Sequence, residues 1–267
     1  MKLTDAQMKQ FHTEGWLLLP DLFTAEEVEV LREEAANVLA SNREEIWREK
    51  NGAPRTAFAA HTYNEAFGLL GRHPRMIEPV EQVFGERVYM HQYKINAKAK
   101  FDGDVWQWHQ DYATWLRDDG MPEPRAMNIS IFLDEVFPFN GALMLVPRSQ
   151  KHGNIQAGHD TSTTAYPLWT LDNATVEKLV KEGGLVQPVG KPGSMLMFHG
   201  NLVHGSAGNI TPFPRRIVYL TLNAVSNAIR KPTRPEWIAH RNPTPIEPCA
   251  DDALANYARA HKRAAAE

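Results

Sequence analysis

The chain has 267 residues, of which 43% are hydrophobic and 23% charged, and its formal net charge is -3. This length and composition are typical of a folded globular protein, so wholesale disorder is excluded. Nucleic-acid-binding proteins usually carry a basic patch or stripe, and the sequence has no long run of like charge, so no nucleic-acid partner is expected.

The remaining bulk features concern location. No apolar run approaches the roughly 18 residues that cross a membrane, and Met1 to Asp5 show no apolar signal-peptide core. Cys249 is the only cysteine, which excludes an internal disulfide and fits a reducing compartment. We expect a cytoplasmic protein without a membrane partner, either a monomer or a homodimer.

The N-terminal part, about 4–84, is expected to be helical. Thr24 and Glu27 have capping-box spacing, and apolar residues follow at helical intervals, which predicts a helix over 25–42. The same kind of reasoning places further elements, namely helices at 4–14, 63–70 and 74–84 and a short strand at 16–19.

Residues 43–62 are charged and irregular. Asn51-Gly52 is a turn signal and Pro54 breaks regular structure, so this segment is expected to be mobile. Arg55 and His61 within it are candidates for a lid that binds a substrate carboxylate.

Short strands dominate the middle of the chain, from about 86 to 225. Asn140-Gly141 is a hairpin signal and predicts a returning strand at 142–146. The other expected elements are strands at 88–97, 105–111, 126–133, 195–198 and 216–225, a long loop at 148–170 and a helix at 170–181.

Helices followed by many short strands predict a mainly β fold with helical additions, for which a jelly roll is a natural core. The expected organisation is a single domain over 1–267, with N-terminal helices at about 4–84, a jelly-roll core at about 86–225 and a tail at 226–267.

The strongest chemical signal is His109-Gln110-Asp111, an H-x-D pair. In an extended strand, residues i and i+2 point to the same face, so the imidazole and the carboxylate are expected to lie side by side. Two histidines and a carboxylate form the triad that binds Fe(II) and leaves positions open for a co-substrate and O₂. His204 is the candidate for the second histidine. The predicted metal ligands and catalytic residues are therefore His109, Asp111 and His204.

An iron centre that activates O₂ needs a source of two electrons, and 2-oxoglutarate supplies them by chelating the metal and losing CO₂. Its distal carboxylate needs a buried cation, and arginine binds a carboxylate through two hydrogen bonds. Arg215, eleven residues after His204, is the candidate, and Arg216 is expected on the opposite face of its strand. Ser206 is expected to donate its hydroxyl to the same carboxylate.

These residues also carry a family resemblance. The stretches His91 to Asn96, Trp108 to Trp115, Asp119 to Pro122, Asn140-Gly141 with Pro147 to Ser149, and His204 to Ser206 with Arg215 resemble the phytanoyl-CoA dioxygenase (PhyH) superfamily. The resemblance runs from the first helix to about residue 225. It is closest to bacterial hydroxylases of free amino acids such as leucine, and more distant from ectoine hydroxylases.

The resemblance implies a double-stranded β-helix core, Fe(II), 2-oxoglutarate and O₂ as cofactors and co-substrates, and hydroxylation of an unactivated C–H bond with release of succinate and CO₂. It implies that Asn96, Ser206 and Arg215 hold 2-oxoglutarate. By the same resemblance, Gln92, Thr114 and Trp115 lie near the substrate. Ascorbate is the expected reductant in vitro.

Departures from the family pattern limit the substrate. Gln110 and Tyr112 differ from the ectoine hydroxylases, which argues against ectoine, and no basic patch suited to coenzyme A is evident. Related halogenases replace the carboxylate with glycine or alanine. The presence of Asp111 therefore favours hydroxylation or desaturation, between which the sequence does not decide.

Several conspicuous residues have a structural interpretation. Trp106 and Trp108 are expected to pack in the core, and His199 lacks an arginine at the matching distance, so it is expected to be a core histidine. His91, His152 and His159 are expected to be structural or loop residues.

Three functions remain open at this point. The first is hydroxylation of a free aliphatic amino acid such as leucine or a derivative. The second is the same chemistry on a larger secondary metabolite, such as an alkaloid, a terpenoid or a carrier-bound residue. The third is a metal-binding jelly-roll protein without turnover.

Overall fold

Two antiparallel sheets form the core of the computed structural model, which describes residues 1–266, so that only the last residue of the predicted tail lies outside it. The larger sheet has the order β1 (Trp16–Leu19), β10 (Met195–His199), β6 (Ala126–Phe132), β12 (Arg215–Ala224), β4 (Val88–Lys98), β3 (Pro54–Phe58) and β2 (Ile46–Arg48). The smaller sheet has the order β7 (Leu143–Leu145), β11 (His204–Ser206), β5 (Trp106–His109), β9 (Leu168–Thr170) and β8 (Gly158–Asp160). This is the predicted mainly β, jelly-roll architecture with helical additions.

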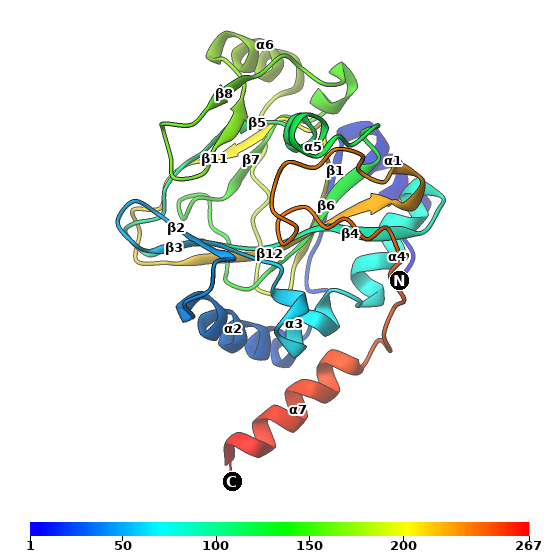
Figure 1. Cartoon of the computed structure of the whole chain (residues 1–267), viewed down its shortest axis with the longest axis vertical. Coiled ribbons are helices and arrows are strands. Elements are labelled where there is room, and N and C mark those ends of the chain that lie inside the picture. The colour runs from blue at the N-terminus through cyan, green and yellow to red at the C-terminus, as the bar shows by residue number, and fades with distance from the viewer. Residues whose placement is uncertain (267) are drawn as a thin grey trace.

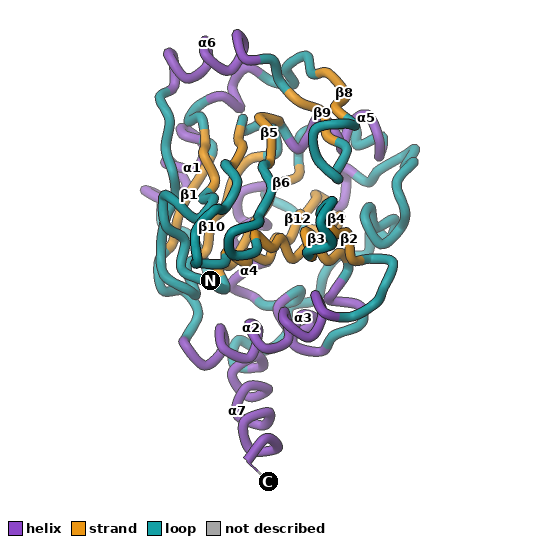
Figure 2. Tube along the Cα trace, turned by 90° about the vertical axis from the view of Figure 1, so that its left-hand side faces the viewer, coloured by secondary structure: helices purple, strands orange, loops and turns teal. Residues whose placement is uncertain are grey.

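Helices cover the outer face of the larger sheet (Figures 1 and 2). They are α2 (Ala25–Ala40), α3 (Glu65–Leu70) and α4 (Pro74–Phe84), and α7 (Ala253–Ala266) packs beneath α2 and α3. The predicted capping box at the start of α2 is present, because the Thr24 hydroxyl accepts from the Glu27 amide and the Glu27 carboxylate accepts from the Thr24 amide. The other helices are α1 (Asp5–Glu14), α5 (Asp111–Asp119), α6 (Asn173–Gly183) and the short 3₁₀ turns at 60–62, 149–152 and 225–227.

Strand β4 is buried on both faces, and the two faces have different chemistry. Tyr93 and Ile95 point outward into the hydrophobic core shared with the helices. Side chains alternate along a strand, so Gln92, Lys94 and Asn96 share the other face and line the cavity between the sheets. One strand therefore supplies both the main core and one wall of the site.

The segment over 43–62 contains two strands, which corrects the expectation that it is irregular; its mobility stays a prediction. It contains β2 and β3, and β3 pairs with β4 from Thr56 to Phe58. Arg55 is buried and its guanidinium Nη1 donates to both oxygens of Glu49 at 2.9 Å. An ion pair inside the hairpin satisfies the charges that, in the sequence, resemble a solvated loop.

Two further expectations about the middle of the chain are wrong. The turn at Asn140-Gly141 forms no hairpin, because β6 belongs to the larger sheet and β7 to the smaller one. The region 148–170 is not one long loop, since it contains both β8 and β9. β7 pairs with β11 and β9 with β5, partners distant in sequence that local turn signals do not reveal, whereas β8 pairs with the nearby β9.

None of the helices in the described part of the chain is both long and apolar enough to span a bilayer.

Candidate active site

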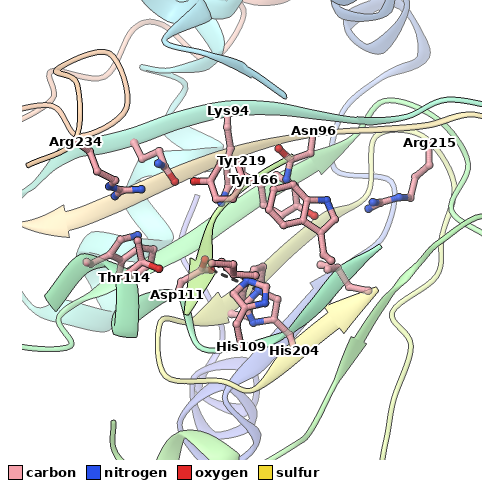
Figure 3. Close-up of a pocket in the computed structure, with 16 residues that line it drawn as sticks. Lys94, Asn96, His109, Asp111, Thr114, Tyr166, His204, Arg215, Tyr219 and Arg234 are labelled. Atoms are coloured by element: carbon pink, nitrogen blue, oxygen red, sulfur yellow. Dashed lines mark ion pairs between the residues drawn. The ribbon is translucent and has the colours of Figure 1, made fainter. Parts of the chain in front are cut away.

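His109, Asp111 and His204 meet at the floor of the cavity (Figure 3). His109 ends β5 and His204 begins β11, and the two residues are direct partners across these antiparallel strands. One ligand atom from each of the three side chains lies within 4.8 Å of the other two, and all three residues are buried. The register of the smaller sheet thus brings together two histidines 95 positions apart in the sequence.

Both imidazole rings have a fixed orientation. The Nδ1 atom of His109 lies 2.6 Å from the Gln107 carbonyl oxygen, and that of His204 lies 2.9 Å from the Leu202 carbonyl oxygen. Because a carbonyl oxygen only accepts, each Nδ1 carries the proton and each Nε2 presents its lone pair to the cluster. Burial, together with the neighbouring His109, lowers the pKa of His204 to about 3, which keeps that ring neutral at pH 7.

Asp111 reaches the cluster from a helix, not from a strand as the H-x-D pattern predicted. It is the first residue of α5, and its two carboxylate oxygens lie 3.7 and 3.6 Å from Nε2 of His109 and His204. A helix N-terminus favours negative charge, and the Asn128 amide donates to the carboxylate. Burial opposes ionisation, but nearby Lys94 and the two histidines outweigh it and hold the pKa of Asp111 well below its usual range.

Helix α5 also places two of the three residues that were predicted near the substrate. Thr114 and Trp115 follow Asp111 at i+3 and i+4, positions that share a helix face, and both line the cavity. The Thr114 hydroxyl is buried and has no hydrogen-bond partner among the described residues. A free hydroxyl beside the cluster is available to a bound molecule.

Trp115 rests on Gly200, and this contact gives a prediction. A β-carbon at position 200 would lie 2.6 Å from Cζ3 of Trp115 and 3.0 Å from the Ala126 carbonyl oxygen. We expect Gly200→Ala to lower the free energy of unfolding by about 1–3 kcal/mol, the usual cost of overpacking, measured by urea denaturation. Gly158→Ala is the control, because a β-carbon there meets nothing within 4 Å. Equal stability of the two variants would contradict this packing.

Arg215 lies at one end of the cavity, on β12 (Figure 3). It is buried, and its Nε and Nη1 atoms have no hydrogen-bond partner among the described residues. Arg216 points to the opposite face, as expected from strand alternation, and forms two 2.8 Å hydrogen bonds to the Asp134 carboxylate. A buried guanidinium without an anion is costly, so Arg215 fits an incoming carboxylate.

The other residues predicted for cofactor and substrate differ in position. Asn96 and Gln92 line the cavity, where the Asn96 oxygen accepts from the Thr56 hydroxyl at 3.0 Å and the Gln92 amide donates to the Ile238 carbonyl at 3.3 Å. Ser206 is buried and its hydroxyl has no partner among the described residues, but it is not among the residues that line the cavity.

Sequence reasoning assigned three residues incorrectly. Trp106 lines the cavity instead of packing in the core. The Arg55 guanidinium stacks 4.0 Å above the Trp106 ring and pairs with Glu49. Arg55 does not line the cavity, so it is not an anchor for a substrate carboxylate there. His61 also lies outside the cavity and stacks on Tyr93. Strand alternation counted back from His109 along β5 does not predict that Trp106 faces the cavity, because the pairing of β5 with β11 is irregular.

Four polar cavity residues were not predicted, namely Lys94, Tyr166, Tyr219 and Arg234. Two of them had a recognisable signal, since Lys94 shares the β4 face of Gln92 and Asn96, and Tyr219 shares the β12 face of Arg215. Tyr166 and Arg234 come from irregular segments, where no periodicity reveals direction. Arg234 lies at the end of the cavity opposite Arg215, with the His109–Asp111–His204 cluster between them (Figure 3).

Two imidazoles and one carboxylate, buried at the base of a jelly-roll cavity, form the donor set of the mononuclear non-haem Fe(II) oxygenases. Each histidine donates its second nitrogen to a backbone carbonyl, which is the usual support for a metal-binding ring. The residues present therefore fit an iron ion. The chain belongs to the phytanoyl-CoA dioxygenase (PhyH) family, whose model matches residues 11–217.

Curated relatives extend over most of the chain. It is 36% identical over 251 residues to the ectoine dioxygenase of Sphingopyxis alaskensis, a match that covers 88% of this chain and 82% of that one. It is 32% identical over 263 residues to the L-proline trans-4-hydroxylase of Streptomyces griseoviridis, covering 94% and 98% of the two chains. The predicted family and enzyme class, a dioxygenase, are confirmed; the closer similarity to leucine hydroxylases stays a prediction.

Solved structures agree with the fold. The crystal structure of EctD from S. alaskensis with 2-oxoglutarate and 5-hydroxyectoine has a TM-score of 0.83 at 34% identity and covers 92% of this chain and 87% of that chain. A second structure of EctD, with bound iron, has a TM-score of 0.79 at 35% identity, with 93% and 86% covered. The carbocyclase SnoK of nogalamycin biosynthesis, at 16% identity, a TM-score of 0.70 and coverage of 93% and 94%, shares the fold alone.

Proposed function

We propose that this protein hydroxylates an unactivated C–H bond of a small free amino acid or a close derivative, with Fe(II), 2-oxoglutarate and O₂. His109, Asp111 and His204 bind the iron, and Arg215 binds the distal carboxylate of 2-oxoglutarate. Bound iron and 2-oxoglutarate supply the oxidising chemistry, with succinate and CO₂ as the co-products. The protein contributes binding, orientation and exclusion of water.

The observation that carries this proposal is the pair of arginines at the two ends of the cavity. Arg215 and Arg234 flank the triad on opposite sides (Figure 3), and each is suited to a carboxylate. Arg215 serves 2-oxoglutarate. Arg234 uses Nε and Nη2 for the Asp119 carboxylate, which leaves Nη1 for a second carboxylate, that of the substrate. The relatives' names, ectoine dioxygenase and L-proline trans-4-hydroxylase, are consistent with a small substrate.

Inside the cavity the chain's residues divide the work. Thr114 offers a free hydroxyl, and the buried Trp115 and Phe198 form apolar walls that hold a hydrocarbon segment away from water. Asn128 donates to Asp111 and so fixes the direction of the carboxylate. The fixed Nδ1 protons of His109 and His204 keep their Nε2 lone pairs directed at the metal position.

Cavity size favours a small substrate over a larger secondary metabolite. The cavity between the lining residues is narrow, with a volume of about 30 Å³. It must widen to accept 2-oxoglutarate and an amino acid such as leucine. An alkaloid, a terpenoid or a carrier-bound residue requires a much larger opening.

The test is a screen of the purified protein with Fe(II), ascorbate, 2-oxoglutarate and each proteinogenic amino acid, with ectoine included because of the relatives. Succinate and product mass are measured together. We expect substrate-dependent succinate and a product one oxygen atom heavier with an aliphatic amino acid. A product two hydrogens lighter means desaturation instead. Succinate that no amino acid or ectoine stimulates overturns the proposed substrate class, and no succinate under any condition overturns the proposed reaction.

A further inference from the structure

Arg234 belongs to the irregular tail that follows the last strand of the jelly roll, yet it lines the cavity. A long side chain on such a segment needs support to hold one position. The support comes from Asp119, the last residue of α5, whose Oδ1 accepts a 2.9 Å hydrogen bond from Nε of Arg234. Nη2 of Arg234 donates to Oδ2, so the pair is bidentate.

A second side chain fixes Asp119 itself. His91, on β4, lies with its Nε2 atom 3.0 Å from Oδ2 of Asp119, and neither side chain is exposed to solvent. Burial opposes ionisation of Asp119, but the hydrogen bonds from His91 and Arg234 outweigh it and lower the pKa of the carboxyl from 3.8 to about 2. Asp119 is therefore a fixed anion at neutral pH.

The backbone of the tail is attached to the same end of α5. The amide of Thr233 donates to the Asp118 carbonyl at 2.7 Å and that of Lys231 to the Asp119 carbonyl at 3.3 Å. Gly120 has φ +66°, and a β-carbon there would lie 2.7 Å from the Lys231 amide nitrogen. Side chain and main chain thus both hold Arg234 to the end of α5.

The same helix begins with Asp111. Residues 111 and 119 are the two ends of the nine-residue helix α5, and at 1.5 Å per residue they lie about 12 Å apart along the axis. A single rigid element therefore joins the proposed metal ligand to the support of the proposed substrate anchor.

We propose that Asp119, oriented by His91, is a positioning residue that holds Arg234 as the substrate-carboxylate anchor, and that α5 sets the distance between this anchor and the metal position. The proposal rests on the proposed function, which makes Arg234 the anchor. In this proposal α5 determines which substrate carbon faces the metal. The substrate class is therefore a carboxylate whose reactive carbon lies at a set distance from the carboxylate group.

The experiment compares Asp119→Asn and His91→Phe with the neighbouring control Asp118→Asn in the full-length, Fe(II)-loaded protein. Asp118 accepts from the Trp169 indole at 3.2 Å and makes no side-chain hydrogen bond with Arg234, and asparagine retains an acceptor for that indole. L-Leucine and L-proline are the first probes, each titrated at saturating 2-oxoglutarate. Calorimetry without O₂ measures their binding independently of turnover.

We expect Asp119→Asn to raise both KM and Kd for the amino acid at least about tenfold, because the hydrogen bonds to a charged group that position Arg234 are weakened. The KM for the co-substrate, 2-oxoglutarate, should stay within about twofold of its value in the unchanged protein. A substitution that only disturbed the structure would raise this KM as well. His91→Phe should show a smaller effect of the same kind, and Asp118→Asn none. Asp119→Glu keeps the charge but places it one methylene further from the backbone. This variant should bind the amino acid better than Asp119→Asn and should change the ratio of hydroxylated positions.

Arg234→Gln separates this inference from the proposed function. If Arg234→Gln leaves the amino-acid KM unchanged, the proposed anchor is wrong. If Arg234→Gln raises it but Asp119→Asn and His91→Phe do not, the anchor stands and the positioning role is overturned. Equal losses of affinity for 2-oxoglutarate and for the amino acid in Asp119→Asn overturn it as well. Should Asp119→Asn fail to fold, Asp119→Glu and His91→Phe carry the test.

Discussion

In the His109→Ala variant, the kcat of substrate-dependent succinate formation should fall by more than about 100-fold. Changing a residue that merely supports a metal ligand typically costs 10–100-fold, and this change removes one ligand of a three-residue site, so the loss should be larger. The Nε2 atom of His109 lies 3.7 Å from an Asp111 oxygen, and no other histidine of the described chain joins that cluster to replace it. Succinate yield and bound iron per chain are the two measurements.

His152→Ala is the matched control. His152 forms only an exposed contact to Glu182, at 3.2 Å, and such surface pairs contribute little to stability. It should retain iron and turnover. A His109→Ala protein that keeps full iron content and full succinate formation would show that the metal lies elsewhere.

The second large effect is expected at Arg215. We expect Arg215→Leu to raise the KM for the co-substrate, 2-oxoglutarate, by about 10- to 100-fold, because hydrogen bonds to a charged group contribute about 1.5–3 kcal/mol. The two unpartnered nitrogens of Arg215 are the donors that would be lost. The amino-acid KM should change much less, since Arg234 lies at the other end of the cavity.

Arg216→Leu provides the comparison from the same strand. Arg216 faces away from the cavity and pairs with the buried Asp134, which also pairs with Arg32 at 3.5 Å, so the loss of Arg216 should lower the free energy of unfolding by about 1–3 kcal/mol. Its affinity for 2-oxoglutarate should match that of the unchanged protein. If the two variants affect 2-oxoglutarate equally, Arg215 has no special role and the proposed orientation of the co-substrate is wrong.

Regular strands are where the sequence predicts side-chain direction best. Strand alternation correctly separates Arg215 from Arg216 and groups Gln92 with Asn96, because period two holds wherever a strand is regular. It fails at Asp111, where the chain changes from β5 to α5 within two residues. The H-x-D pattern at this point is compatible with a strand or with the start of a helix. Only the pairing of β5 with β11 determines how the ligand side chains lie relative to one another.

Long-range pairs explain what the sequence does not reveal. Asp119 and Arg234 are 115 positions apart, and neither stands in a repeating pattern that indicates a cavity. Arg55 and Glu49 look like solvated loop charges until β3 pairs with β4 and buries them. The role of a charged residue in a segment without periodicity is therefore determined by its tertiary contacts. A single sequence gives no recognisable signal of those contacts.

The position of Arg234 separates it from the other residues of the proposed site. The family match ends at residue 217, so it includes the triad and Arg215 but stops before the tail. An irregular segment tolerates insertion and replacement more readily than a strand does. Under the proposed function, the residues for oxidation and the anchor for the substrate therefore lie in different parts of the chain, and substitutions in the tail should change the preferred substrate without removing the iron site.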